Sequence, residues 1–177
     1  MYSKEQLADL VLHDPGEFNN YKATMGEDNE TDLTESDFSN ATVTEVDFSG
    51  CDLSGSTFAD ANLSLVNFSD ANLEAVDFTR ANASECDFSG AVLNGTNFNF
   101  SVLNYCNFND SDMTGCVLDE ADLTDSDFTG ANNLSSCRFD TATIWPDNDM
   151  LPQDFDSSPA KDLFSGEDEE EKPAEDY

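Results

Sequence analysis

Three residue types in this sequence could do chemistry: cysteines, a single histidine and many carboxylates. The chain holds 5 Cys, 1 His and 39 Asp+Glu. Thiolates and imidazoles bind zinc, and a paired acid and base can move protons. The carboxylates are spread so evenly that no pair stands out, and His13 has no Ser, Cys or metal-ligand constellation around it. Because there is no Gly-rich phosphate loop either, we expect no catalysis, no metal and no cofactor.

The elements that position these groups follow a period of five residues. From Leu33 to Phe128 an apolar side chain falls on every fifth position, twenty times in succession. A helix repeats every 3.6 residues and a strand every two, so neither would place all of these side chains on one side. A chain that turns a corner every five residues would bury all of them. After a one-residue slip at 132–133 the series is expected to resume at Leu134, Phe139 and Ile144.

Small residues occupy the position two before most of these central residues, as the corner of a narrow core requires. All five cysteines fall there, which predicts that the thiols pack as small apolar groups. Six glycines fall two positions after a central residue, where a tight turn with positive φ favours glycine. The cysteines are Cys51, Cys86, Cys106, Cys116 and Cys137, and the glycines are Gly50, Gly55, Gly90, Gly95, Gly115 and Gly130.

Three units match the pattern A(D/N)LXX: Ala61-Asn62-Leu63, Ala71-Asn72-Leu73 and Ala121-Asp122-Leu123. On these residues the chain resembles the pentapeptide-repeat family over about residues 31–145. The resemblance implies an all-β solenoid, a right-handed quadrilateral β-helix with four repeats per coil, and it carries over no active site. Twenty repeats would make five coils, roughly 27 Å long at ~4.8 Å per layer. Phenylalanines should then stack on two opposite faces.

Both ends of such a stack need a cap, because bare strand edges invite association. Residues 1–30 are expected to form an N-terminal cap with a helix from about Lys4 to His13, begun by a capping box at Ser3. Residues 146–164 are expected to close the other end, and 165–177 form an acidic tail that we expect to be disordered. The segment from Trp145 to Phe155 could also join two copies end to end.

The formal net charge of −33 limits which kinds of partner can bind the chain. Like charges repel nucleic acid and anionic lipid, so we expect neither to bind directly; a basic protein partner, or a salt-rich habitat, is favoured. With no signal sequence recognised at the N-terminus, a cytoplasmic location is expected. One face of the predicted coil presents an acid in every coil, in two alternating columns. These acids are Asp47, Asp70, Asp87, Asp110 and Asp127.

Residues 88–109 break the acidic pattern, because they contain no acid at all. Phe100 and Tyr105 take outward positions in this neutral belt and form a candidate contact patch. Two functions remain open. Some pentapeptide-repeat proteins resemble DNA and bind type II topoisomerases such as gyrase, and the acidic columns favour that role. Alternatively, the chain is a structural or adaptor module with an unknown protein partner, and its acidity reflects salt adaptation or solubility.

Overall fold

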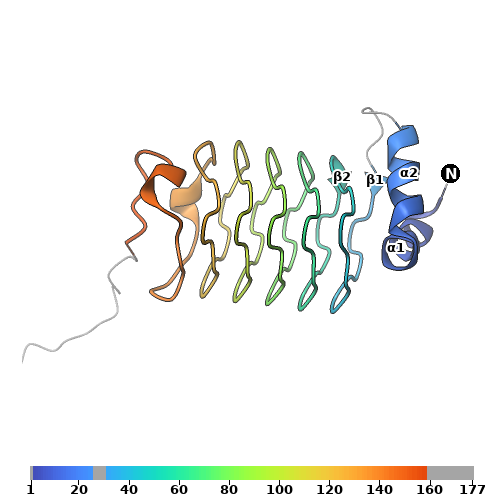
Figure 1. The fold of residues 1–177 in the computed structure, drawn as a ribbon, viewed down its shortest axis with the longest axis horizontal. Helices are drawn as coiled ribbons and strands as arrows, with labels where there is room; N and C mark the ends of the chain where they lie inside the picture. Colours follow the sequence, from blue (N-terminus) through green and yellow to red (C-terminus); the bar gives the residue numbers. More distant parts are fainter. Residues whose placement is uncertain (1, 26–30, 159–177) are drawn as a thin grey trace, which may run out of the picture.

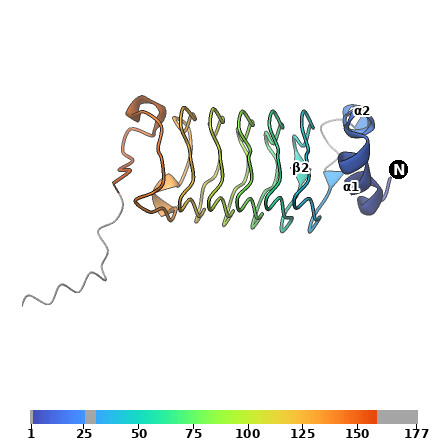
Figure 2. The ribbon, with the colours of Figure 1, turned by 60° about the horizontal axis from the view of Figure 1, so that its bottom comes forward.

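The protein is a stack of coils with helices at its N-terminal end (Figure 1). The computed structural model describes residues 2–25 and 31–158. Helices α1 (Lys4–His13) and α2 (Pro15–Met25) lie side by side, and the coils follow one another away from them. The rotated view in Figure 2 shows the same regular stacking from a second side.

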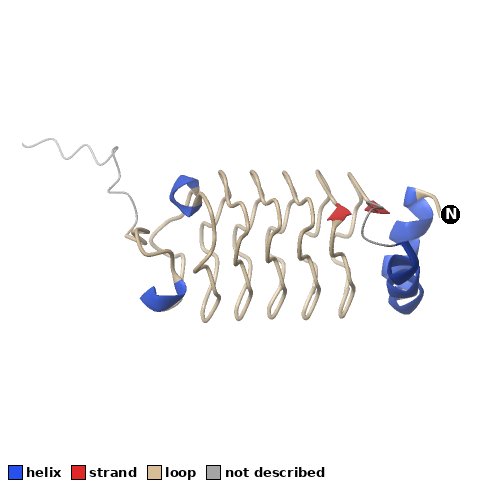
Figure 3. Cartoon of the chain, turned by 90° about the horizontal axis from the view of Figure 1, so that it is seen from above, coloured by secondary structure: helices blue, strands red, loops and turns tan. Residues whose placement is uncertain are grey.

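Pairing between coils is carried by short contacts. Within residues 2–25 and 31–158 only β1 (Thr31–Asp32) and β2 (Cys51–Asp52) form strands, and they pair in parallel. Elsewhere, as far as Asn132, single parallel bridges join positions twenty residues apart, such as Asn67 and Asp87, so four repeats make one coil as expected. Figure 3 accordingly draws most of the rod as loop. Since two of every five residues form a turn, no side of the coil is long enough for a regular strand.

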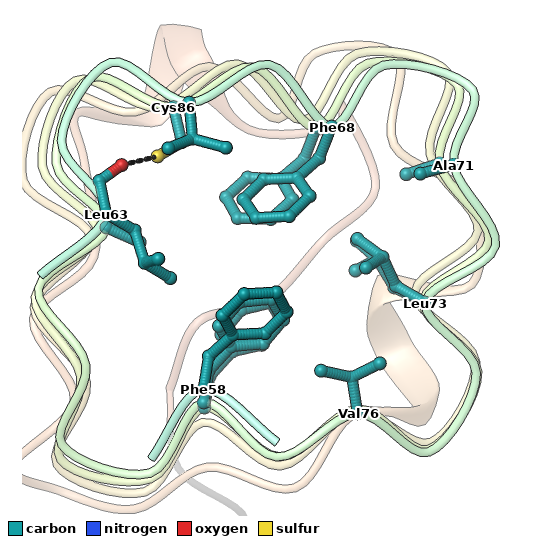
Figure 4. Packing of buried hydrophobic residues seen from close by; sticks show 14 of the residues in the cluster. Phe58, Leu63, Phe68, Ala71, Leu73, Val76 and Cys86 are labelled. Atoms are coloured by element: carbon teal, nitrogen blue, oxygen red, sulfur yellow. Dashed lines mark hydrogen bonds between the residues drawn. The ribbon is translucent and has the colours of Figure 1, made fainter. Parts of the chain in front are cut away.

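The central residues form the core. Every member of the series from Leu33 to Phe128 is at most 1% exposed. Figure 4 looks along the rod and shows Phe58, Leu63, Phe68 and Leu73 entering from the four sides of one coil to meet in the middle. Burying such a side chain contributes ~1.5–3 kcal/mol, so repetition of this one position supplies most of the driving force for folding.

Two stacks of phenylalanines meet inside the core. Phe68, Phe88 and Phe108 stack with ring centroids 5.1 and 5.0 Å apart and planes 5° apart. Phe78 and Phe98, from the opposite face, meet Phe88 nearly edge-on at 5.9 and 5.8 Å. Coils ~4.8 Å apart place rings at the separation that offset stacking prefers. The predicted stacking on two opposite faces is therefore confirmed.

The last residue of each regular corner lies in the left-handed backbone region. Gly90 adopts it with φ 67°, and so do Asp70 with φ 57° and Phe100 with φ 60°. A side chain in this conformation costs roughly 1–2 kcal/mol. Gly130 departs from the prediction, because its φ is not positive. Close approach explains that glycine instead, since a Cβ there would lie 2.6 Å from Asn109 Oδ1.

Both N-terminal helices have clear start signals. The Ser3 side chain accepts from the backbone N–H of Gln6, whose own side chain accepts from Ser3, so the predicted capping box and helix are confirmed. Asp14 then separates α1 from α2 and accepts from the backbone of Glu17 at 3.1 Å. Pro15 suits the first position of α2 because its missing N–H would have no partner there.

Side chains of α2 replace the coil that is missing below the first one. Asn19 Oδ1 accepts from the backbone N–H of Asp47 at 2.9 Å, and its Nδ2 donates to the Glu45 carbonyl at 3.0 Å. Lys22 Nζ donates to the Ser49 carbonyl at 2.5 Å. Phe18, also on α2, covers the core at this end of the rod, with its ring centroid 5.6 Å from that of Phe48. The open edge of the first coil is thus satisfied on this side by the cap.

The repeat slips twice beyond Phe128, and one sequence prediction is wrong. Arg138 pairs with the residue 21 positions before it, as one slip requires, but Ile144 pairs with Asp122, 22 positions before it. A second extra residue therefore enters after Phe139. Ile144 consequently points outward and is 52% exposed, while Trp145 takes the inward position.

The described part of the C-terminal segment packs over the last coil. Trp145 packs against Phe128 and Phe155 at ring distances of 6.1 and 4.9 Å, and the Phe128 N–H donates to the Met150 carbonyl at 2.8 Å. Two short 3-10 helices, η1 (Leu134–Ser136) and η2 (Asn148–Met150), belong to this end. The predicted acidic tail and the last residues of the predicted cap, from 159 onward, lie outside the described residues.

Candidate protein-binding surface

The predicted acidic residues lie in two columns on one side of the rod. Asp47, Asp87 and Asp127 share the first column, where they alternate with Asn67 and Asn107. The amide of Asn67 donates to Asp47 Oδ1, and that of Asn107 to Asp87 Oδ1, each at 3.1 Å. Carboxylates in neighbouring coils would repel at ~4.8 Å, whereas an amide between them donates a charge-assisted hydrogen bond. The column therefore carries one stabilised charge every two coils.

These three aspartates also build the corner that follows them. Asp47 accepts from the backbone N–H of Ser49 at 3.0 Å, Asp87 from Ser89 at 2.9 Å and Asp127 from the residue two positions on at 2.9 Å. Each bond closes an Asx turn, which holds the backbone in position for the bend. All three side chains are half-buried. They carry charge and shape the coil at once, which the sequence did not indicate.

Asp70 and Asp110 form the second column, at the corner itself. Both are exposed, and both have the positive φ of that position. They alternate with glycines, and a Cβ at Gly90 would lie 2.3 Å from Asp70 Oδ1, so this carboxylate lies over the glycine. Among the described residues neither carboxylate has a hydrogen-bond partner. These two are the charges that a partner could engage without disturbing the coil.

Phe100 and Tyr105 occupy the two corners that flank a single side of one coil. They are 48% and 62% exposed, and Val102 between them is 37% exposed. The φ of 60° at both aromatic residues is unusual for such bulky side chains. We call Phe100, Val102 and Tyr105 the apolar strip. Sequence reasoning missed Val102, although its place one before a central residue, where polar residues are common, could have revealed it.

Acidic residues border the apolar strip along the rod. Glu85 and Asp125 lie one coil to either side of Tyr105, and a hydrogen bond to Asp125, followed by the charge of Asp125, raises the pKa of the Tyr105 phenol. Glu120 lies next to Phe100, and Asp122 is paired with Val102. The corner at Tyr105 also adjoins the side of the rod that carries the first column, in which aspartates alternate with asparagines. The two sets of predicted residues therefore lie on adjacent sides of the rod.

The cysteines are part of the core, as predicted. All five are buried and unpaired. The Cys86 thiol donates to the Leu63 carbonyl of the preceding coil at 2.9 Å, and Cys106 donates to Ala83 at 3.0 Å. Burial raises the pKa of the Cys86 thiol to about 12 and that of Cys51 to about 11. A thiol that stays protonated is a poor nucleophile and a poor metal ligand.

The raised pKa of Cys86 predicts a loss of stability in alkali. The unfolded thiol ionises above ~8.5, whereas the folded one stays protonated to about 12. Stability is complete below the unfolded value and falls as pH rises through this window, by up to ~1.4 kcal/mol per pH unit for this group. Cys86→Ser should flatten the decline, because Ser56 fills the equivalent position and donates to the Leu33 carbonyl at 2.9 Å. Urea unfolding at pH 7 and pH 10 measures how far the free energy of unfolding falls in each protein. An equal fall in the native chain and in Cys86→Ser would contradict the prediction.

The described residues hold no group of three or more His, Cys, Asp or Glu that could bind a metal ion. His13 is bonded within α1, where its Nδ1 lies 3.0 Å from both the carbonyl and the carboxylate of Asp9. None of the described helices is long and apolar enough to cross a membrane.

Comparisons with known proteins agree with this architecture. Two family models match the chain, a pentapeptide repeat region over residues 29–98 and pentapeptide repeats over residues 101–144. The chain therefore belongs to the pentapeptide repeat family. Membership implies a right-handed quadrilateral β-helix, the fold that the resemblance in the sequence also implied.

Solved structures of the family resemble this chain. The pentapeptide repeat protein Rfr23 from the cyanobacterium Cyanothece 51142 is 19% identical, with a TM-score of 0.44 over 72% of this chain and 97% of that one. A thylakoid-lumen member from Arabidopsis thaliana is 29% identical, with a TM-score of 0.29 over 58% and 64%. The plasmid-mediated fluoroquinolone resistance protein QnrB1 is 18% identical, with a TM-score of 0.23 over 62% and 80%. A comparison with curated proteins finds no match.

Proposed function

We propose that this chain is a non-catalytic rod that takes the place of DNA on a DNA-binding protein, with a type II topoisomerase such as gyrase as the candidate partner. The charge of the rod carries the proposal. Residues 31–145 contain twenty acids and two arginines, a net of −18. Over roughly 27 Å this is one charge per ~1.5 Å, close to the ~1.7 Å of duplex DNA. Some pentapeptide-repeat proteins resemble DNA and bind type II topoisomerases such as gyrase, which supports the choice of partner.

The two arginines of the rod do not present free positive charge to a partner. Arg80 pairs with Asp60 at 2.6 Å and Arg138 pairs with Asp119, so both cations are neutralised by acids of the same rod. A groove that holds DNA is lined by Lys and Arg side chains, and it would meet carboxylates here where phosphates normally lie. The stacked core makes the carboxylate spacing rigid, so little conformational entropy is lost on binding.

A titration of DNA supercoiling by gyrase tests the proposal. We expect inhibition at micromolar concentrations and moderate salt, weakening as salt rises because the contact is electrostatic. Asp70→Asn with Asp110→Asn should weaken it severalfold, since these exposed carboxylates have no described role in the coil. The matched control is Glu35→Gln with Glu74→Gln, which removes the same charge at a different corner. No inhibition by the native chain would remove gyrase as the partner.

An adaptor role, with acidity that reflects salt adaptation, is the second candidate, and the exposed aromatics are compatible with it as well, because an apolar contact does not need a DNA-binding partner. Under that alternative the chain should require molar salt to remain folded and should leave gyrase unaffected. End-to-end dimerisation remains a separate proposal. The rings of Trp145 and Phe155 pack against each other within one chain, so a dimer at that end would use the outer surface of this cluster.

A further inference from the structure

The neutral belt, residues 88–109, also carries most of the exposed apolar side chains of the rod. Of the large hydrophobic side chains exposed between Thr31 and Phe128, all but Leu65 lie within residues 88–109, which contain no charge of either sign. Three of them form the apolar strip on one side of the coil, and Val92 lies on another side. Charged side chains are thus absent where most apolar side chains are exposed, and they return in the coils immediately before and after the belt.

The apolar strip is costly to the fold. Phe100 and Tyr105 hold φ values of 60°, whereas Gly95 in the same coil fills the equivalent corner with φ 67°. Bulky side chains rarely adopt this conformation, and the rings are too exposed to regain the cost by packing. Every regular corner of the rod has this φ, but among the described corners only Leu65, Phe100 and Tyr105 carry a large apolar side chain there. The fold therefore needs the backbone conformation and not these two aromatic rings, whose presence points to a function.

We propose that the apolar strip is the anchor of the partner contact, and that it fits a protein surface with an apolar centre and a rim of Lys and Arg side chains. This inference rests on the proposed function and names the face involved. Interfaces commonly place aromatic residues at a dry centre and charged groups at the rim. Here the aromatic pair is the centre, and Glu85, Glu120 and Asp125 supply an acidic rim that a basic rim complements.

Other occupants fit less well. Duplex DNA and anionic membranes are repelled by the acidic rim. A second copy would bring the same acids to the rim, where the two sets of carboxylates repel each other. A basic protein satisfies both the rim and the centre.

The test separates the strip from the choice of gyrase by using two lysine-rich helical peptides of equal length and charge. One presents leucines on a single face, and the other presents glutamines there. We expect the full chain to bind the leucine peptide about tenfold more tightly, a preference that survives added salt because it is apolar. Fluorescence anisotropy of labelled peptides measures both affinities.

Phe100→Gly with Tyr105→Gly is the decisive variant, because glycine suits these corners and should leave the urea midpoint unchanged or higher. It should abolish the tenfold preference while still binding both peptides through charge. Leu65→Gly is the matched control, an exposed apolar residue with φ 62° outside the belt, and it should keep the preference.

Equal binding of the two peptides by the native chain, or a preference that persists in the double variant, would overturn the proposal. Analytical ultracentrifugation could also overturn the proposal. If the native chain were a dimer and the double variant a monomer, a second copy of the chain would be the occupant of the apolar strip. A preference for the leucine peptide without inhibition of gyrase would support the strip and reject gyrase.

Discussion

Phe88→Ala is expected to lower the free energy of unfolding by ~3–5 kcal/mol, the cost of a large cavity in a rigid core. Phe88 is fully buried between Phe68 and Phe108, and the rings of Phe78 and Phe98 meet it from the opposite face. The hole cannot collapse, because hydrogen bonds between coils set the coil spacing. Chemical denaturation in urea measures the loss.

Phe88→Leu is the control for this substitution. Leucine fills the same central position at Leu93, so a coil of this size accepts it, and a loss of about 1 kcal/mol is expected from the smaller volume change. A loss for Phe88→Ala no greater than that for Phe88→Leu would show that the core relaxes around the hole. The rod would then not be rigid, and a fixed spacing of surface carboxylates could not be assumed.

Asn67→Asp combined with Asn107→Asp is expected to cost ~3 kcal/mol or more at pH 7. The double variant makes five successive carboxylates from Asp47 to Asp127, and it removes the amides that donate to Asp47 and Asp87. Each lost hydrogen bond to a charged group is worth ~1.5–3 kcal/mol, and like charges ~4.8 Å apart add repulsion. The Asx turns survive, because aspartate can accept from the same backbone N–H groups. Urea unfolding at pH 7 measures the cost.

Acid should reverse this loss. Repulsion raises the pKa of the crowded carboxyls in the folded state, so the penalty is complete above that value and disappears as pH falls below the unfolded pKa near 4. Asn82→Asp is the matched control, because its column neighbours, Asn62 and Val102, are uncharged. It should cost little at either pH. A double variant that is no less stable at pH 7 than at pH 4.5 would show that the amides do not stabilise the column.

The sequence predicted much of this fold because burial repeats in register with the chain. Each central residue, from Leu33 to Phe128, is independently driven out of water, so the period of five alone identifies the inside of the coil. The capping box at Ser3 was readable for a similar reason, since its partners are three residues apart. Ile144 was misplaced because it is apolar and fits the period, although the pairing with Asp122 turns it outward.

Contacts between residues twenty positions apart were harder to predict. Asp47, Asp87 and Asp127 were recognisable as acids on one side, but their half-burial and their Asn67 and Asn107 partners appear only when coils stack. The alternation of Asp and Asn at a spacing of twenty was a usable signal. Nothing local indicated that Asn19 would complete the edge of the first coil.

For this protein, then, the sequence by itself determined which side chains are inside, how often the chain turns, and that the surface is strongly acidic. The tertiary structure decided which carboxylates are bonded, which are free, and that Val102 joins Phe100 and Tyr105 on one side of a coil. The physical reason is that burial of an apolar side chain depends on its own position in the repeat. A hydrogen bond or a contact patch depends on the two or three residues that stacking brings together.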